Sequence, residues 1–168
     1  MTTVGGFLVK LLGGVSAEQR EGLSLDPGAR QWEIPGRVDV AVFFKALPAL
    51  LPDGATLFVE GKPSARVKEF LGAHAVEATA KIERGTGWPR QVVFHVAVDR
   101  DTMNGLAELA EEHAAPELAD HIVVYRDNRV LLSWYDFVDD PIYLAGEVAD
   151  EQVEEFCRAL AVQATRRP

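Results

Sequence analysis

Helical spacing of apolar residues recurs at four places along the chain. At each place an apolar residue returns every three or four positions, and a residue that favours helix N-termini stands just before the pattern. The first three are the capping residues Asp39, Ser64, and Asp101 or Thr102, and the fourth helix is expected to begin at Asp150. The pattern therefore predicts four helices, each of which buries one face against the rest of the protein.

Short apolar runs bounded by Gly, Pro or turn residues predict β-strands between these helices. They lie at residues 7–12, 31–34, 55–61 and 91–98, and the last of these runs is the most continuous, as is typical of a buried strand. The pair Ser16 and Gln19 forms a capping-box pattern, which predicts one more short helix after the first strand.

Residues 121–135 give the strongest hairpin pattern, because Asp127 and Asn128 tolerate the positive φ angles of a two-residue turn. This turn would set Tyr125 opposite Val130 and His121 opposite Trp134. Both faces of the hairpin would then be apolar, which predicts a strand pair covered on two sides or one with a docking face.

Helices alternate with strands along most of the chain, and the hairpin precedes the final helix. This order predicts an α+β (or α/β) fold, in which helices pack on a mixed β-sheet and a C-terminal hairpin is followed by a helix. The chain has 168 residues, 48% of them hydrophobic, and shows no repeat or linker. We expect a single domain at residues 1–165 and a frayed tail at 166–168.

The net charge of −9 lies wholly in the second half of the chain. Residues 1–84 hold ten basic and ten acidic side chains, whereas residues 85–168 hold seven and sixteen. An acidic surface repels phosphate backbones and anionic lipids, so we expect neither nucleic acid nor a membrane as partner. The negative charge favours solubility, binding of a cation or binding to a basic protein surface. Self-association through the hairpin is left open.

The single cysteine and the pattern of the first residues together lead us to expect a cytoplasmic location. Cys157 has no second cysteine to pair with, which fits a reducing compartment. The apolar run at residues 7–12 is interrupted by Lys10 and has no basic leader, so it does not resemble a signal peptide.

Three aspartates gather immediately after the hairpin, at Asp136, Asp139 and Asp140. Carboxylates on a loop can bind Mg²⁺ or Ca²⁺, but this spacing matches no calcium-loop pattern. Aspartate is also a common turn residue, and we favour that role here. The candidate binding residues of this region are His121, Trp134, Tyr135, Asp136, Asp139 and Asp140.

No complete catalytic motif is present. The serines lack a nucleophile-elbow pattern, the histidines lack zinc-ligand spacing, and Cys157 falls on an apolar helix stripe. The sequence predicts no metal ligands and no cofactor. It favours a non-catalytic interaction or regulatory domain that binds a basic or partly apolar protein partner. The alternative is a small divalent-metal-dependent hydrolase with His121 as base and the three aspartates as ligands.

Overall fold

The computed structural model describes residues 21–85, 89 and 91–168. The strand and helix expected before residue 20, and most of the expected turn at 85–89, lie outside these residues. The described elements are β1 (Gln31–Ile34), α1 (Val40–Leu50), β2 (Thr56–Gly61), α2 (Ala65–Ala73), β3 (Val92–Ala97), α3 (Arg100–Glu112), β4 (His121–Arg126), β5 (Arg129–Trp134), β6 (Ile142–Ala145), α4 (Asp150–Ala159) and β7 (Thr165–Arg167).

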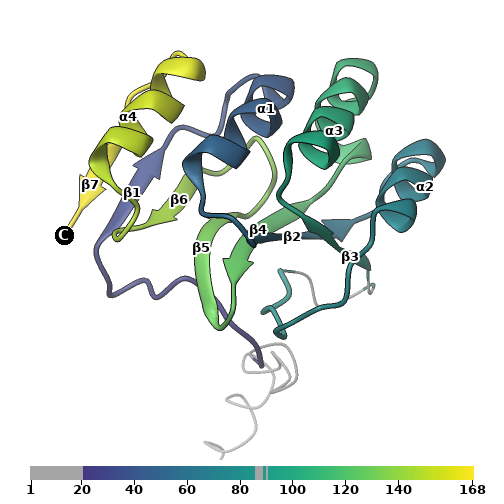
Figure 1. Ribbon diagram of the computed structural model, residues 1–168, viewed down its shortest axis with the longest axis horizontal. Coiled ribbons are helices and arrows are strands. Elements are labelled where there is room, and N and C mark those ends of the chain that lie inside the picture. Colours follow the sequence, from purple (N-terminus) through teal and green to yellow (C-terminus); the bar gives the residue numbers. More distant parts are fainter. Residues whose placement is uncertain (1–20, 86–88, 90) are drawn as a thin grey trace, which may run out of the picture.

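The seven strands form one sheet in the order β3-β2-β4-β5-β6-β1-β7. The α+β class is confirmed, but every pairing of these strands is antiparallel, so the sheet is not mixed as expected. Figure 1 shows the four helices side by side on one face of the sheet. We call the opposite face, which none of the described α-helices covers, the open face. A two-layer arrangement of this kind buries one side of an antiparallel sheet and leaves the other available.

Side-chain caps start three of the helices. Asp39 accepts a hydrogen bond from the Val42 amide at 3.1 Å and Ser64 accepts one from Val67, as the sequence predicts. The third helix begins earlier than expected, because Asp99 rather than Asp101 or Thr102 provides its cap. The inward faces of the helices and the sheet form the main core, which includes Phe43, Leu47, Leu57, Val67, Met103, Ile122, Leu132, Trp134, Leu144 and Phe156.

The two edge strands of the sheet differ from the sequence prediction. Strand β3, expected to be buried, is an edge strand, and Val92 at its start is 38% exposed. The loop after α2 protects this edge, since Val76 donates its amide hydrogen to the His95 carbonyl at 2.8 Å. At the other edge, Arg166 and Arg167 belong to β7, which pairs with β1. The tail that we expected to fray is therefore held by backbone hydrogen bonds.

A β-bulge in the hairpin changes the expected register. Tyr125 pairs with Val130 as predicted, but Val124 pairs with Leu132, so Leu131 is the extra residue. Beyond the bulge Trp134 pairs with Ile122 instead of His121. The prediction that His121 and Trp134 share a face was therefore wrong: one extra residue reverses the alternation of side chains along the end of β5.

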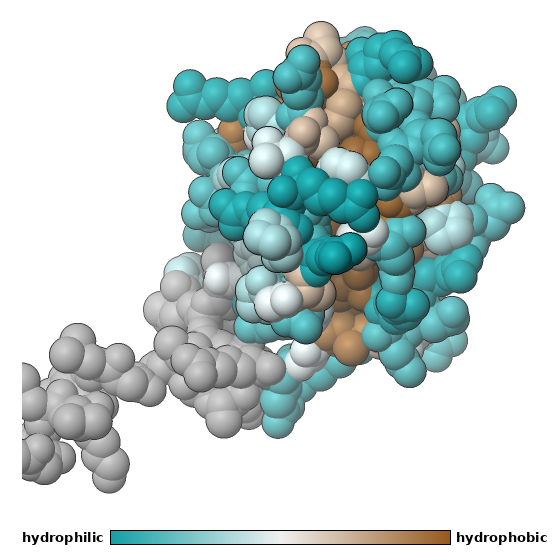
Figure 2. Space-filling model, turned by 90° about the vertical axis from the view of Figure 1, so that its left-hand side faces the viewer, coloured by the Kyte–Doolittle hydropathy of each residue, from teal (hydrophilic) through white to brown (hydrophobic). Residues whose placement is uncertain are grey.

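The open face has a smaller apolar cluster of its own. Its buried members are Phe58, Ile82, Val123, Tyr125 and Val130, and the segments before β1 and after α2 supply Leu23, Leu25 and Ala80. Figure 1 shows both segments on this side of the sheet. From the side that carries α4 and β7, hydrophilic side chains cover most of the surface, with an apolar strip between them (Figure 2). No described helix is long and apolar enough to cross a bilayer.

His95 on the open face gives a pH-dependent prediction. Its Nδ1 lies 2.9 Å from the Tyr125 hydroxyl, and burial lowers the pKa of His95 below the ordinary value of 6.5. The unfolded chain therefore takes up a proton that folded His95 resists, so the contribution of His95 to stability falls as the pH drops below 6.5. The stability advantage of the wild type over His95→Gln, measured by urea unfolding, should shrink from pH 7.5 to pH 5. Val93→Ala removes no titratable group. The difference in unfolding free energy between the wild type and Val93→Ala should therefore stay constant with pH.

Candidate functional site

Four strands bring polar side chains together on the open face near the β7 edge. Tyr143 of β6 is the cross-strand partner of both Ser133 of β5 and Glu33 of β1. Two residues before Glu33 on β1, and on the same face, Gln31 pairs with Arg167 of β7. Directly paired residues project on the same side of a sheet, so the strand order alone gathers residues that are far apart in the sequence.

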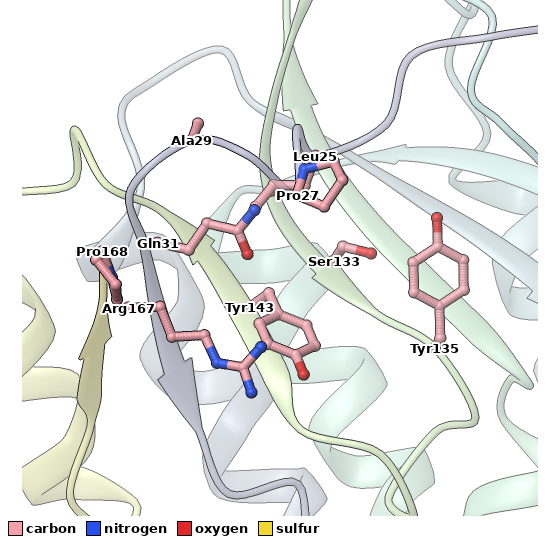
Figure 3. Close-up of a pocket in the computed structure, with 9 residues that line it drawn as sticks. All are labelled: Leu25, Pro27, Ala29, Gln31, Ser133, Tyr135, Tyr143, Arg167 and Pro168. Atoms are coloured by element: carbon pink, nitrogen blue, oxygen red, sulfur yellow. The ribbon is translucent and has the colours of Figure 1, made fainter.

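Of these side chains, all except that of Glu33 border a cavity of about 600 Å³. Figure 3 shows the polar groups of Gln31, Ser133, Tyr135, Tyr143 and Arg167 around it, whereas the segment before β1 supplies the apolar part of the wall. That apolar part consists of Leu25, Pro27 and Ala29. A volume of this size is within the range of about 300–1,000 Å³ that small-molecule sites occupy. We refer to this cavity as the open-face pocket.

The floor of the open-face pocket contains a buried hydroxyl. Ser133 is only 2% exposed, and its Oγ lies beside Tyr135 without the geometry of a hydrogen bond. The same hydroxyl interacts with the Tyr135 phenol, so the two groups form one polar part of the wall. Small-molecule sites combine apolar walls with a few polar groups of this kind, which fix the orientation of a ligand.

Arg167 provides positive charge at the rim. Its Nε forms an ion pair with Glu33 Oε2, and its guanidinium lies over the Tyr143 ring, 5.4 Å from the centroid. Gln31, the cross-strand partner of Arg167, is buried, and its Nε2 donates a hydrogen bond to the Asp26 carbonyl. These contacts restrict the orientation of both side chains, and binding loses less conformational entropy when the site is already ordered.

Tyr135 joins the open-face pocket to a second polar cluster. Its ring stacks on His121, with the centroids 3.8 Å apart and the planes 24° from parallel. Burial raises the pKa of Tyr135; the Ser133 hydroxyl opposes this effect, and the carboxylates of Glu83 and Glu60 add to it. The phenol therefore stays protonated at neutral pH and can donate a hydrogen bond.

A buried carboxylate lies at the centre of the second cluster. Glu60 is fully buried on β2; its Oε1 accepts from Arg84 Nε at 3.0 Å, and its Oε2 accepts from the Gly85 amide at 2.8 Å. His121 is 2% exposed, and its Nδ1 is 3.5 Å from the same Oε2. Gly85 has little room for a side chain, since an ideal Cβ there would lie 2.8 Å from His121 Nδ1. The cluster is therefore closely packed, and it fixes the ring on which Tyr135 stacks.

The structure separates the residues that the sequence proposed as a site. Tyr135 lines the open-face pocket and His121 supports it, but Trp134 lies in the main core between Phe43 and Phe137. Asp136, Asp139 and Asp140 are exposed on the turn after β5, and no hydrogen bond or ion pair among the described residues joins them to His121. The amides of Asp139 and Asp140 both donate to the Asp136 carbonyl, which is turn geometry.

Metal binding has no geometric support in the described part of the chain. Across residues 21–85, 89 and 91–168, no group of three or more His, Cys, Asp or Glu side chains is arranged to hold a metal ion. The predicted metal-dependent alternative requires His121 and the three aspartates to converge, and the turn does not place them together. The sequence did not single out Gln31, Ser133, Tyr143 or Arg167 as site residues. Gln31 and Ser133 lie in predicted strands, whereas Arg167 lies in the tail that was expected to fray.

The aspartate turn packs against Gly36, which allows a test of this geometry. An ideal Cβ at Gly36 would lie 1.9 Å from the Asp140 carbonyl oxygen, a backbone atom that cannot rotate away. Gly36→Ala should therefore destabilise the protein by about 1–3 kcal/mol, the usual cost of overpacking, in a thermal or urea unfolding experiment. At Gly28 the nearest atom is the mobile Asp26 side chain at 3.4 Å, so Gly28→Ala should have a much smaller effect. Equal effects would show that the turn is not packed as described.

Comparisons with known proteins add no assignment to this geometry. No protein-family model matches the chain, and no curated protein or solved structure is significantly similar to it. The residues of the open face are therefore the evidence for the function of this protein.

Proposed function

We propose that the protein is a non-catalytic binding domain that holds a partly apolar protein partner on the open face of its sheet. The observation that carries this proposal is the 600 Å³ pocket on that face, in which the buried Ser133 lies between two tyrosines. Tyrosine favours binding surfaces because its rigid ring supplies contact area and its hydroxyl supplies a hydrogen bond.

The arrangement of layers supports the same proposal. The four described helices cover one face of the sheet, so the open face depends on short segments for cover. The described residues that line the pocket include no histidine, so Ser133 has no general base beside it there. The geometry therefore favours binding over chemistry.

The partner's charge and the protein's location remain proposals from the sequence. The acidic side chains of the second half include Asp150, Glu151, Glu154 and Glu155 of α4 and the aspartates of the turn, and all of these are exposed. A partner that reaches beyond the open-face pocket to these groups would carry basic residues there. A cytoplasmic location remains an expectation from the single cysteine.

Selection from a displayed library of random peptides, with the full chain as bait, tests the proposed function. Enriched peptides should contain apolar or aromatic residues, and their affinity should fall at least tenfold with Tyr143→Ala, because that change removes the ring between Ser133 and Arg167. Tyr143→Phe keeps the ring and should retain most of the affinity. Glu154→Gln on α4 should have no effect. Peptides whose binding is indifferent to Tyr143→Ala would place the partner elsewhere and refute the proposal.

A further inference from the structure

Hydrogen-bond donors and one positively charged side chain line the open-face pocket. The hydroxyls of Ser133, Tyr135 and Tyr143 can each donate, and Arg167 has N–H groups besides the Nε that meets Glu33. Among the residues that the structure describes, Arg167 is the one charged side chain that lines the pocket. No acidic side chain is part of this lining. The pocket therefore offers a better environment to an acceptor, and above all to an anionic one, than to a cation.

The orientation of Arg167 suits a planar anion. Glu33 binds the guanidinium on its Nε side, and the Tyr143 ring covers one of its faces, so the plane of the guanidinium is set before any ligand arrives. Figure 3 shows the guanidinium next to Tyr143 at the pocket, on the side away from Tyr135. A guanidinium held in this way can donate two parallel hydrogen bonds to a carboxylate, which is the strongest pairing available to it.

The rest of the wall suits an apolar group attached to that carboxylate. Leu25, Pro27 and Ala29 lie along the segment before β1, and the two tyrosine rings line the opposite strands. A ligand with a carboxylate and an aromatic or aliphatic body would meet charge at Arg167 and apolar surface beyond it. The carboxyl terminus of a peptide with an apolar last residue and a small aromatic acid both have this chemistry.

We infer that the open-face pocket recognises a carboxylate joined to an apolar body, with Arg167 as the anion-binding residue and Glu33 as the residue that positions it and moderates its charge. This inference rests on the proposed function and specifies the group that the pocket binds. Glu33 competes with the ligand for the same guanidinium, so its presence lowers the affinity. Arg166, the neighbour of Arg167, is a natural control: its guanidinium lies over Trp32 and bonds Asp150, outside the pocket lining.

The test uses three probes and isotope-labelled full-length protein, with binding followed by amide chemical shifts. The probes are phenylacetate, an acetylated peptide that ends in a free Phe carboxylate, and the same peptide as its C-terminal amide. We expect the free peptide to bind at least tenfold more tightly than the amide, and to shift the resonances of Ser133, Tyr143 and Gln31. Arg167→Gln should abolish this preference, Arg166→Gln should leave it unchanged, and Glu33→Gln should increase the affinity for the free acid.

The outcomes separate this inference from the proposed function. Tighter binding of phenylacetate than of the peptide acid would identify a small acid as the ligand, and the reverse would identify a peptide terminus; both support the inference. Equal binding of acid and amide at the pocket would overturn the carboxylate inference and leave the proposed function standing. A preference that survives Arg167→Gln, or the absence of any shift at the pocket, would also overturn it. Only failure of the peptide selection as well would remove the proposed function.

Discussion

Replacing Trp134 with alanine is expected to destabilise the protein by about 3–5 kcal/mol, the range observed when a fully buried aromatic side chain is removed from a core. Trp134 has no exposed surface; its ring is 4.9 Å from the centroid of Phe43 and 4.4 Å from that of Phe137. Its Nε1 also donates to the Asp140 carbonyl at 2.9 Å, which ties the aspartate turn to the core. Urea unfolding followed by circular dichroism would measure the loss.

Two further variants separate packing from this hydrogen bond. Trp134→Phe keeps a large ring but not the Nε1 donor, so it should cost less than the alanine variant. Val92→Ala, at a position that is 38% exposed on the edge strand, should change the free energy of unfolding by less than about 1 kcal/mol. A loss below 1 kcal/mol for Trp134→Ala would mean that Trp134 is not a core residue.

The second large effect is expected at Arg84. Replacing it with methionine removes the guanidinium 3.0 Å from the fully buried Glu60 carboxylate. Loss of one partner of a buried ion pair commonly costs about 3–5 kcal/mol; the one-third exposure of Arg84 places the expected loss nearer 2–3 kcal/mol. Equilibrium unfolding would measure it. Tyr135 should also lose order, because the cluster around Glu60 positions the His121 ring beneath it.

A second substitution tests whether the charge of Glu60 is the cause. The double variant Glu60→Gln with Arg84→Met removes the charge of Glu60 together with that of Arg84, so it should be more stable than Arg84→Met alone. Arg66→Met breaks an ion pair with Glu112 in which both side chains are at least half exposed, and it should cost less than about 1 kcal/mol. A double variant that is the least stable of the series would show that the cluster is held by shape and not by charge balance.

Local sequence rules were sufficient to predict most of the helices and the hairpin turn. Asp39 and Ser64 cap helices because their side chains reach the amides three residues on, a preference that depends on neighbouring residues alone. Asp127 adopts the positive φ of 52° that the two-residue turn requires. The strand β6, by contrast, has only four residues after a proline and lacks a distinctive pattern, and β7 has three exposed ones.

The bulge and the open-face pocket depend on interactions that local patterns do not record. The run Val130 to Leu132 is apolar throughout, so nothing in it marks Leu131 as the doubled residue. The bulge places Trp134 on the helix side, where it packs between Phe43 and Phe137. In the same way, Gln31 and Arg167 become neighbours only when β7 pairs with β1. Tyr135 and His121 were found because they stand at the hairpin, and their partners were missed because they come from distant strands.

The extra residue in β5 makes the two sides of this strand sensitive to chain length. If the same residues were paired without the bulge, regular alternation would carry the Ser133 hydroxyl to the helix side and the Trp134 indole to the open side. Deletion of Leu131 would remove the bulge and leave both side chains on their present faces, because Leu132 would still pair with Val124. An insertion of one codon between Leu132 and Ser133 would instead exchange an interior ring for a binding group in a single evolutionary event. A homologue one residue longer here would retain the same architecture and present a different recognition surface.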